Sequence, residues 1–197
     1  MEPRRCRDGG SHQLAGGGGR CRAPGGYRAP PHWCITGPLS MRHSSDRVEG
    51  YRAALEAGRT EVDESLIIEV DRLLVEGDLG QVCGGRAARA LLDREDPPTA
   101  IFACDDHLAL GALEAVPTDY SSPRAVSVVG FDDLPYTMFN LPLLTTIGQP
   151  VREMAMYATR MVLNHVPGTP LPAERVEFPT EFVLRETAHG PIPSTAD

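Results

Sequence analysis

Charged side chains in this sequence gather just after its apolar runs, where they are available to contact a ligand. The runs TAIFAC (99–104) and VSVVGF (126–131) are each followed directly by two aspartates. Carboxylates accept pairs of hydrogen bonds from hydroxyl groups, and arginine donates hydrogen bonds in a planar fork. A rim of both types suits a small ligand with several hydroxyl or amine groups. Its members are, in chain order, Arg42, His43, Asp46, Arg47, Asp78, Asp105, Asp106, Asp132 and Asp133.

The same side chains also have a structural explanation. An aspartate after a buried strand often caps the next helix or lies in a turn, and this applies to Asp105 and Asp106. Arg47 falls in the first turn of a predicted helix, where it could pair with a carboxylate of that helix. Asp132 precedes a loop without a clear helix, so a binding role and a turn role stay equally open.

Parallel strands with helices between them would bring these residues to one edge. Apolar runs alternate with helical segments at a repeat of about 30 residues, as a βαβ unit requires. The runs are continuous, which indicates strands covered by helices on both faces. We therefore predict an α/β fold with a parallel, doubly wound sheet, whose ligands bind beyond the carboxyl ends of the strands. The predicted strands are 34–38, 65–70, 73–78, 99–104 and 125–131, and the predicted helices are 46–58, 84–95 and 107–116.

The C-terminal part follows another pattern. Residues 143–150 read as a strand that stops at Pro150. Residues 151–166 form an amphipathic helix with apolar residues at i, i+3, i+4 and i+7. Residues 176–184 read as a strand that contains Pro179, so we expect it at an edge of the sheet.

Composition limits the possible partners. The 197 residues carry 27 acidic and 19 basic residues, a formal net charge of −8. Residues 1–33 hold six arginines and two acidic residues, and 12 of the 33 are glycine or proline, so we predict a disordered tail. The rest of the chain holds 13 arginines and 25 acidic residues, a net charge of −12 that repels phosphate backbones. We expect no direct binding of nucleic acid by this chain.

Several other classes of protein are disfavoured. The sequence has no apolar run of membrane-spanning length and no apolar stretch after its N-terminal arginines, so we expect a cytoplasmic protein without membrane contact. The five cysteines have irregular spacings that match neither a disulfide framework nor a zinc site, and we predict no metal and no cofactor. Motifs of hydrolases, phosphate-binding loops and metalloproteases are missing, so we predict that the chain is not an enzyme.

Four segments in this order closely resemble the C-terminal half of LacI/GalR-type transcriptional regulators. They are PTAIFACDDHLALGAL, VSVVGFDDLPY, LTTIGQPVREM and FPTEFVLRET. A fifth segment, ITGPLSMRHSSDRVEGYRAAL, is similar to the part that opens the second subdomain of that family. The resemblance covers residues 34–187. It implies a periplasmic-binding-protein type I fold, in which two Rossmann-like subdomains enclose an effector, often a sugar or a nucleobase. In the full-length family it also implies a homodimer that binds operator DNA.

The resemblance assigns effector contacts to five positions. The family's effector-binding arginine matches Arg47 in the segment DRVEGY, and its ligand-binding aspartate matches Asp132 in GFDD. Contacts in the loop after the first strand fall on Met41 and His43, where the family often has an arginine or another polar group. A ligand-stacking aromatic residue of the family corresponds to Leu79. Of the other acidic positions, Asp106 matches an aspartate with a mainly structural role, and Asp105 and Asp78 remain possible members of the rim.

Large parts of the family pattern do not appear in this sequence. We find no helix-turn-helix, no hinge helix and no first subdomain of about 100 residues, and the helix at 151–166 belongs by resemblance to that subdomain. We therefore expect a truncated regulator with an exposed helix, no specific operator binding and weak or absent effector affinity. We divide the chain into a tail at 1–33, a partial effector-binding domain at 34–187 (34–142 and 143–187) and a second tail at 188–197. The alternatives are a solute-binding protein for sugar uptake, and a non-functional fragment or interaction module.

Overall fold

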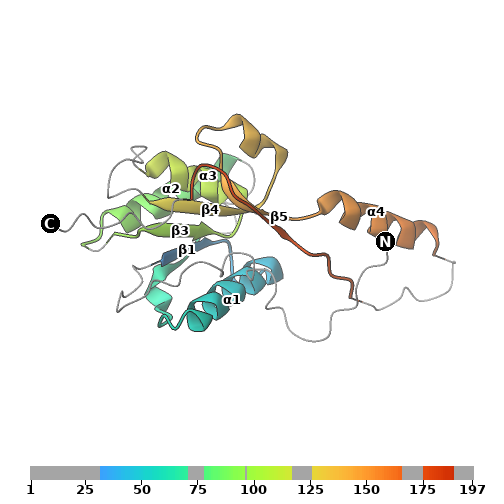
Figure 1. The fold of residues 1–197 in the computed structure, drawn as a ribbon, viewed down its shortest axis with the longest axis horizontal. Coiled ribbons are helices and arrows are strands. Elements are labelled where there is room, and N and C mark those ends of the chain that lie inside the picture. The colour runs from blue at the N-terminus through green and yellow to red at the C-terminus, as the bar shows by residue number, and fades with distance from the viewer. Residues whose placement is uncertain (1–31, 71–77, 96, 117–125, 166–174, 189–197) are drawn as a thin grey trace.

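A computed structural model describes residues 32–70, 78–95, 97–116, 126–165 and 175–188. They form one six-stranded sheet in the order β2-β1-β3-β4-β5-β6 (Figure 1). The pairs from β2 to β5 are parallel, and β6 is antiparallel to β5 at the edge. The predicted α/β class and mostly parallel sheet are therefore confirmed. The strands are β1 (His32–Thr36), β2 (Ile67–Glu69), β3 (Ala100–Ala103), β4 (Ser127–Asp132), β5 (Thr145–Gly148) and β6 (Glu181–Val183).

Helices cover both faces of the sheet. In Figure 1, α1 lies on one face, and α2 and α3 lie together on the other. Two short 3-10 helices, η1 and η3, precede β2 and follow β4. The helices are α1 (Arg42–Ala57), α2 (Asp78–Leu92), α3 (Asp106–Ala115), α4 (Val151–Leu163), η1 (Glu64–Leu66) and η3 (Pro135–Phe139).

Alternate residues of β1 show why the apolar runs have no gaps. Trp33 and Ile35 pack into the large cluster under α2 and α3, and each is at most 1% exposed. Cys34 points to the other face, where it packs with Val48 and Tyr51 of α1. Each large apolar side chain buried in this way contributes about 1.5–3 kcal/mol. The strand begins at His32, whereas the sequence placed residues 32 and 33 in the tail.

Glycines set the spacing between α2 and α3. A Cβ at Gly84 would lie 2.1 Å from the carbonyl oxygen of Leu108, and one at Gly111 would lie 1.8 Å from that of Gln81. The predicted helix at 84–95 is wrong at its start, because the two glycines at 84 and 85 lie inside α2 as its contact surface. Asp78 opens this helix and does not end a strand, and residues 73–77 of the predicted strand lie outside the described residues.

Helix α1 also begins earlier than its pattern predicts. Met41 is its N-cap residue and makes no side-chain capping hydrogen bond, so the predicted cap at 44–46 is wrong. The backbone N–H of Met41 donates to the carbonyl oxygen of Pro38 at 2.9 Å, and this turn leads directly into the helix. Ser44 is buried within the first turn, beside Gly37.

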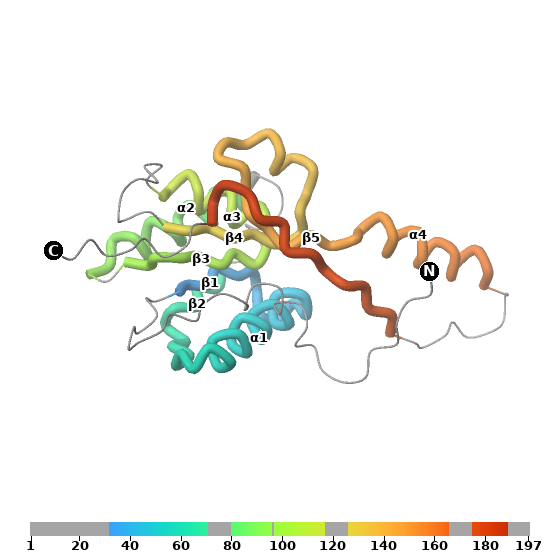
Figure 2. Tube along the Cα trace, in the orientation of Figure 1, coloured from blue at the N-terminus to red at the C-terminus, as the bar shows by residue number. Residues whose placement is uncertain are grey.

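The chain leaves the sheet after β5 and later returns to it. Figure 2 shows it running from β5 into α4, which stands apart from the helices on the sheet, and coming back as β6. All residues of α4 are at least partly exposed, as the sequence predicts. The predicted edge position of β6 is confirmed, but Pro179 precedes the strand and is not part of it. None of the helices in the described ranges is long and apolar enough to cross a membrane.

Candidate functional site

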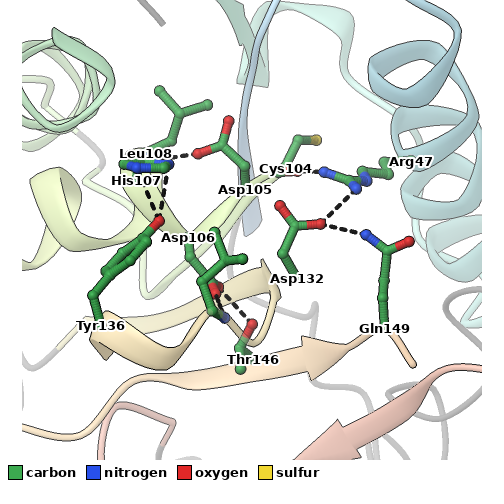
Figure 3. Close-up of polar contacts among 11 residues, drawn as sticks. Arg47, Cys104, Asp105, Asp106, His107, Leu108, Asp132, Tyr136, Thr146 and Gln149 are labelled. Carbon is green, nitrogen blue, oxygen red and sulfur yellow. Dashed lines mark hydrogen bonds and ion pairs between the residues drawn. The ribbon is translucent and has the colours of Figure 1, made fainter. Parts of the chain in front are cut away.

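An ion pair between Arg47 and Asp132 lies at the carboxyl edge of the sheet. Nη2 of Arg47 is 2.7 Å from Oδ1 of Asp132 (Figure 3). The arginine comes from α1 and the aspartate is the last residue of β4, 85 positions further along the chain. The structure thus joins two residues to which the resemblance assigns effector contacts. The alternative pairing of Arg47 within its own helix is not seen, since Asp46 pairs instead with Arg42 at 3.6 Å.

Arg47 is held on three sides. Its Nη1 donates to the carbonyl oxygen of Cys104, just beyond β3. Its guanidinium carbon lies 4.0 Å from the centre of the Phe131 ring, a cation–π geometry. The residue is only 8% exposed, and these contacts hold its guanidinium group with Nη2 toward Asp132. Such fixed donors bind a ligand without first losing conformational freedom.

The backbone at Asp132 is unusual. Its φ is 118° and that of Asp133 is 57°, so two successive non-glycine residues lie at positive φ. Such conformations cost of order 1–3 kcal/mol each and persist only where contacts hold them. The side-chain amide of Gln149, just after β5, donates to the same Oδ1 atom of Asp132 that Arg47 contacts. The carboxylate therefore has two donors and is still 18% exposed.

Asp105 caps α3 as the sequence predicts. Its Oδ1 accepts from the backbone N–H of Leu108 at 2.8 Å, and burial raises the pKa of its carboxyl group. The side chain is half-buried on the same edge as Asp132. Close by, the hydroxyl of Tyr136 lies 2.9 Å from Nδ1 of His107 (Figure 3). This pair extends the polar edge toward η3.

Asp106 does not cap the helix and is completely buried. Its Oδ1 accepts from Oγ1 of Thr146 at 2.6 Å, and its Oδ2 accepts from the backbone N–H of Leu134 at 2.8 Å. Desolvation raises the pKa of Asp106 to about 6, although both hydrogen bonds act in the opposite direction. A Cβ at Gly130 would lie 2.5 Å from Oδ1 of Asp106, so β4 needs a glycine where this carboxylate passes. The residue joins α3 to β5 and to the loop after β4.

The other residues predicted to contact the effector are not among those described in contact with the Arg47–Asp132 pair. Met41 is half-buried at the start of α1, and His43 is exposed on its first turn. The side chains of Asp78 and Leu79 lie outside what the structure describes. Sequence reasoning missed Gln149 and the Phe131 ring, although both belong to segments that carry the resemblance. The only available signal was their position directly at the ends of predicted strands.

Comparisons with known proteins identify the family of this fold. Residues 33–188 match the family model of the periplasmic binding protein-like domain. The chain is 31% identical over 157 residues to the ribose operon repressor of Halalkalibacterium halodurans, covering 79% of this chain and 44% of that protein. Among solved structures, the complex of the transcriptional regulator CelR with cellobiose is 32% identical with a TM-score of 0.66, covering 80% of this chain and 46% of that one. The lac repressor dimer bound to operator and the anti-inducer ONPF is 25% identical with a TM-score of 0.64, covering 79% of this chain and 44% of that one.

The match to the family model extends over more than half of the sequence. The chain therefore belongs to the periplasmic binding protein-like domain family, in the form found in LacI-type transcriptional regulators. It spans less than half the length of the ribose operon repressor.

Proposed function

We propose that this chain is the effector-sensing part of a LacI-type transcriptional regulator, and that it binds a small ligand of the sugar or nucleobase class. The observation that carries the proposal is the Arg47–Asp132 pair at the carboxyl edge of the sheet, with Gln149 beside it. Arginine donors and an accessible carboxylate can together bind neighbouring hydroxyl groups of a sugar ring. A sugar is favoured, because the similar regulator CelR was solved in complex with cellobiose.

The roles of the other residues follow from their positions. Asp132 accepts hydrogen bonds from the effector and Arg47 donates to it, while Met41, His43 and Leu79 are secondary candidates for contact. Asp105 contributes to the rim. Asp106 stabilises this edge of the sheet through its buried hydrogen bonds to Thr146 and to the backbone of Leu134. Asp78 keeps a possible place in the rim. No catalytic step is assigned to any of these groups. Dimerisation and operator binding belong, in this proposal, to the full-length regulator, as in the lac repressor dimer on its operator.

A titration followed by NMR tests this proposal. Cellobiose, ribose, other mono- and disaccharides and nucleosides are added in turn to the isotope-labelled 197-residue chain, up to millimolar concentrations. We expect one class to shift the guanidinium signals of Arg47 and the amide signals of Asp132 and Gln149. The affinity should be weak, about 1 mM, because the described site offers one sheet edge and no enclosing wall.

Two variants give the titration its control. Asp132→Asn should weaken binding by about tenfold or more, because it removes a charged acceptor. Glu64→Gln neutralises an exposed carboxylate outside the rim, which pairs with Arg52 of the same helix as Arg47, and it should bind as the wild type does. The proposal is wrong if no ligand of the panel shifts these signals, or if Asp132→Asn responds like the wild type.

A further inference from the structure

A second ion pair lies on the other side of the strained turn at the end of β4. Nη2 of Arg185 is 2.6 Å from Oδ1 of Asp133, and the two side chains are only 13% and 29% exposed. Arg185 comes from the segment just after β6, where the chain has returned from α4. The effector-site carboxylate of Asp132 is therefore adjacent in sequence to a residue that is fixed from the C-terminal segment.

Arg185 is itself firmly attached to the sheet. Its Nη1 donates to the carbonyl oxygen of Leu144 at 2.9 Å, and its backbone N–H donates to Oγ1 of Thr145 at 2.9 Å. Both acceptors lie on or next to β5, the neighbour of β4. One arginine thus connects three parts of the chain: the end of β4, β5 and the segment after β6.

The position of Asp133 shows what this connection holds. Asp133 lies over Gly148 of β5, where an added Cβ would be 3.3 Å from Cβ of Asp133. Its φ of 57° is in the left-handed region, directly after the φ of 118° at Asp132. Both conformations are uncommon for a residue other than glycine, so the turn depends on the contacts that hold it. Its side-chain contacts are Arg185 at Asp133, and Arg47 with Gln149 at Asp132. The backbone N–H of Gln149 also donates to the carbonyl oxygen of Asp132 at 3.3 Å.

We infer that Arg185, acting through Asp133, is a positioning residue for Asp132. It holds the left-handed turn that directs the Asp132 carboxylate toward Arg47, and so preorganises the effector site. The inference rests on the proposed function for its meaning, because the positioned group is the expected effector contact. Arg185 also links Asp132 to the segment that follows β6. A displacement of this segment would therefore change the direction in which the Asp132 carboxylate points.

Solvent exchange of the Arg47 guanidinium protons, measured by NMR without any ligand, tests the inference in the full 197-residue chain. The Phe131 ring and the burial of Arg47 should give these protons distinct shifts and slow exchange. In Arg185→Met and Asp133→Ala we expect the exchange to become about tenfold faster, because the turn is no longer held. Asp133→Asn should stay within about twofold of the wild type, since asparagine tolerates positive φ and still accepts a hydrogen bond from Arg185.

The control removes an ion pair from the helix that carries Arg47. Nη2 of Arg52 is 2.6 Å from Oε2 of Glu64, and this pair is more exposed than Arg185–Asp133. Arg52→Met should therefore leave the exchange of the Arg47 protons unchanged. The inference is overturned if Arg185→Met leaves the exchange at the wild-type rate, or if Arg52→Met raises it equally. Should Arg185→Met not fold, the contrast between Asp133→Ala and Asp133→Asn decides, and equal rates in those two variants overturn the inference. Because no ligand is present, a failed sugar titration would contradict the proposed function and leave this result standing.

Discussion

Asp106 connects three elements through one buried carboxylate. It accepts from Thr146 of β5 and from the backbone at Leu134, and it belongs to the first turn of α3. A buried carboxylate with raised pKa is neutral in the folded protein at a pH where it is already ionised in the unfolded chain. The stability of the protein should therefore depend on the protonation of this one side chain.

We expect Asp106→Asn to change the pH dependence of stability. The pKa of Asp106 is about 6 in the folded state against an ordinary value of 3.8, so the folded protein holds the extra proton between these values. The wild type should then lose stability as the pH rises from about 4 to about 6. Asparagine does not ionise, so the variant should lack this loss of stability. Over this range the free energy of unfolding of Asp106→Asn should improve relative to the wild type by up to about 3 kcal/mol.

Urea unfolding at a series of pH values measures this difference. Asp46→Asn is the matched control, because its carboxylate is accessible and pairs only with an exposed arginine. Its difference from the wild type should not follow the same curve. A difference between Asp106→Asn and the wild type that stays constant from pH 4 to pH 6 would contradict the assignment.

Single residues show what the sequence could and could not predict about the site. Arg47, Asp132 and the cap at Asp105 were predictable, because they stand at strand ends and in motifs that carry the resemblance. The contacts of Gln149 and Phe131 with this pair were not, because they depend on the register between strands. The register places Asp132 of β4 opposite Gly148 of β5, and Gln149 follows directly. No local pattern encodes such a pairing.

Elements were predicted well where one apolar pattern decides them. The strands β1, β3, β4 and β5 lie within or beside their predicted ranges, because continuous burial leaves a clear signal. The starts of α1 and α2 were predicted poorly, because α1 begins without a capping side chain and α2 carries glycines in its interior. Those of α3 and α4 were predicted to within one residue. Glycine usually weakens a helix, so its presence there indicates a close approach of two backbones.

A graded effect should follow when these glycines are replaced by alanine. An added Cβ would lie 1.8 Å from the nearest backbone atom at Gly111, 2.1 Å at Gly84 and 3.0 Å at Gly85. The first two distances require the helices to move apart, so Gly111→Ala and Gly84→Ala should lower the free energy of unfolding by about 3 kcal/mol or more. Gly85→Ala should cost clearly less, since its gain in helix propensity of about 1 kcal/mol offsets a milder contact. Chemical unfolding of the three variants gives the comparison, and equal costs would mean that α2 and α3 are not as close in solution.

At the scale of the whole molecule, the described residues form a packed sheet body and an extension. The body contains the apolar clusters on both faces of the sheet and the Arg47–Asp132 edge. The extension is α4, whose residues are all at least partly exposed. The rings of Tyr157 in α4 and of Phe178 meet edge-on, with their centres 5.8 Å apart. An exposed helix was expected here from the family resemblance, which assigns 151–166 to the first subdomain. Its energetic consequence is that α4 should add little to the stability of the body.

Substitutions on the apolar stripe of α4 should therefore leave the stability of the chain unchanged. Val162 and Val151 are 67% and 53% exposed, so Val162→Ala and Val151→Ala remove little buried surface. We expect each to change the free energy of unfolding by less than about 0.5 kcal/mol. Leu108→Ala in the core is the positive control and should cost about 2–5 kcal/mol, because it leaves a cavity beneath the sheet. Urea unfolding of dilute protein measures all three. A cost of more than about 1 kcal/mol for either α4 variant would show that this stripe is covered in solution, either by the chain itself or by a second molecule.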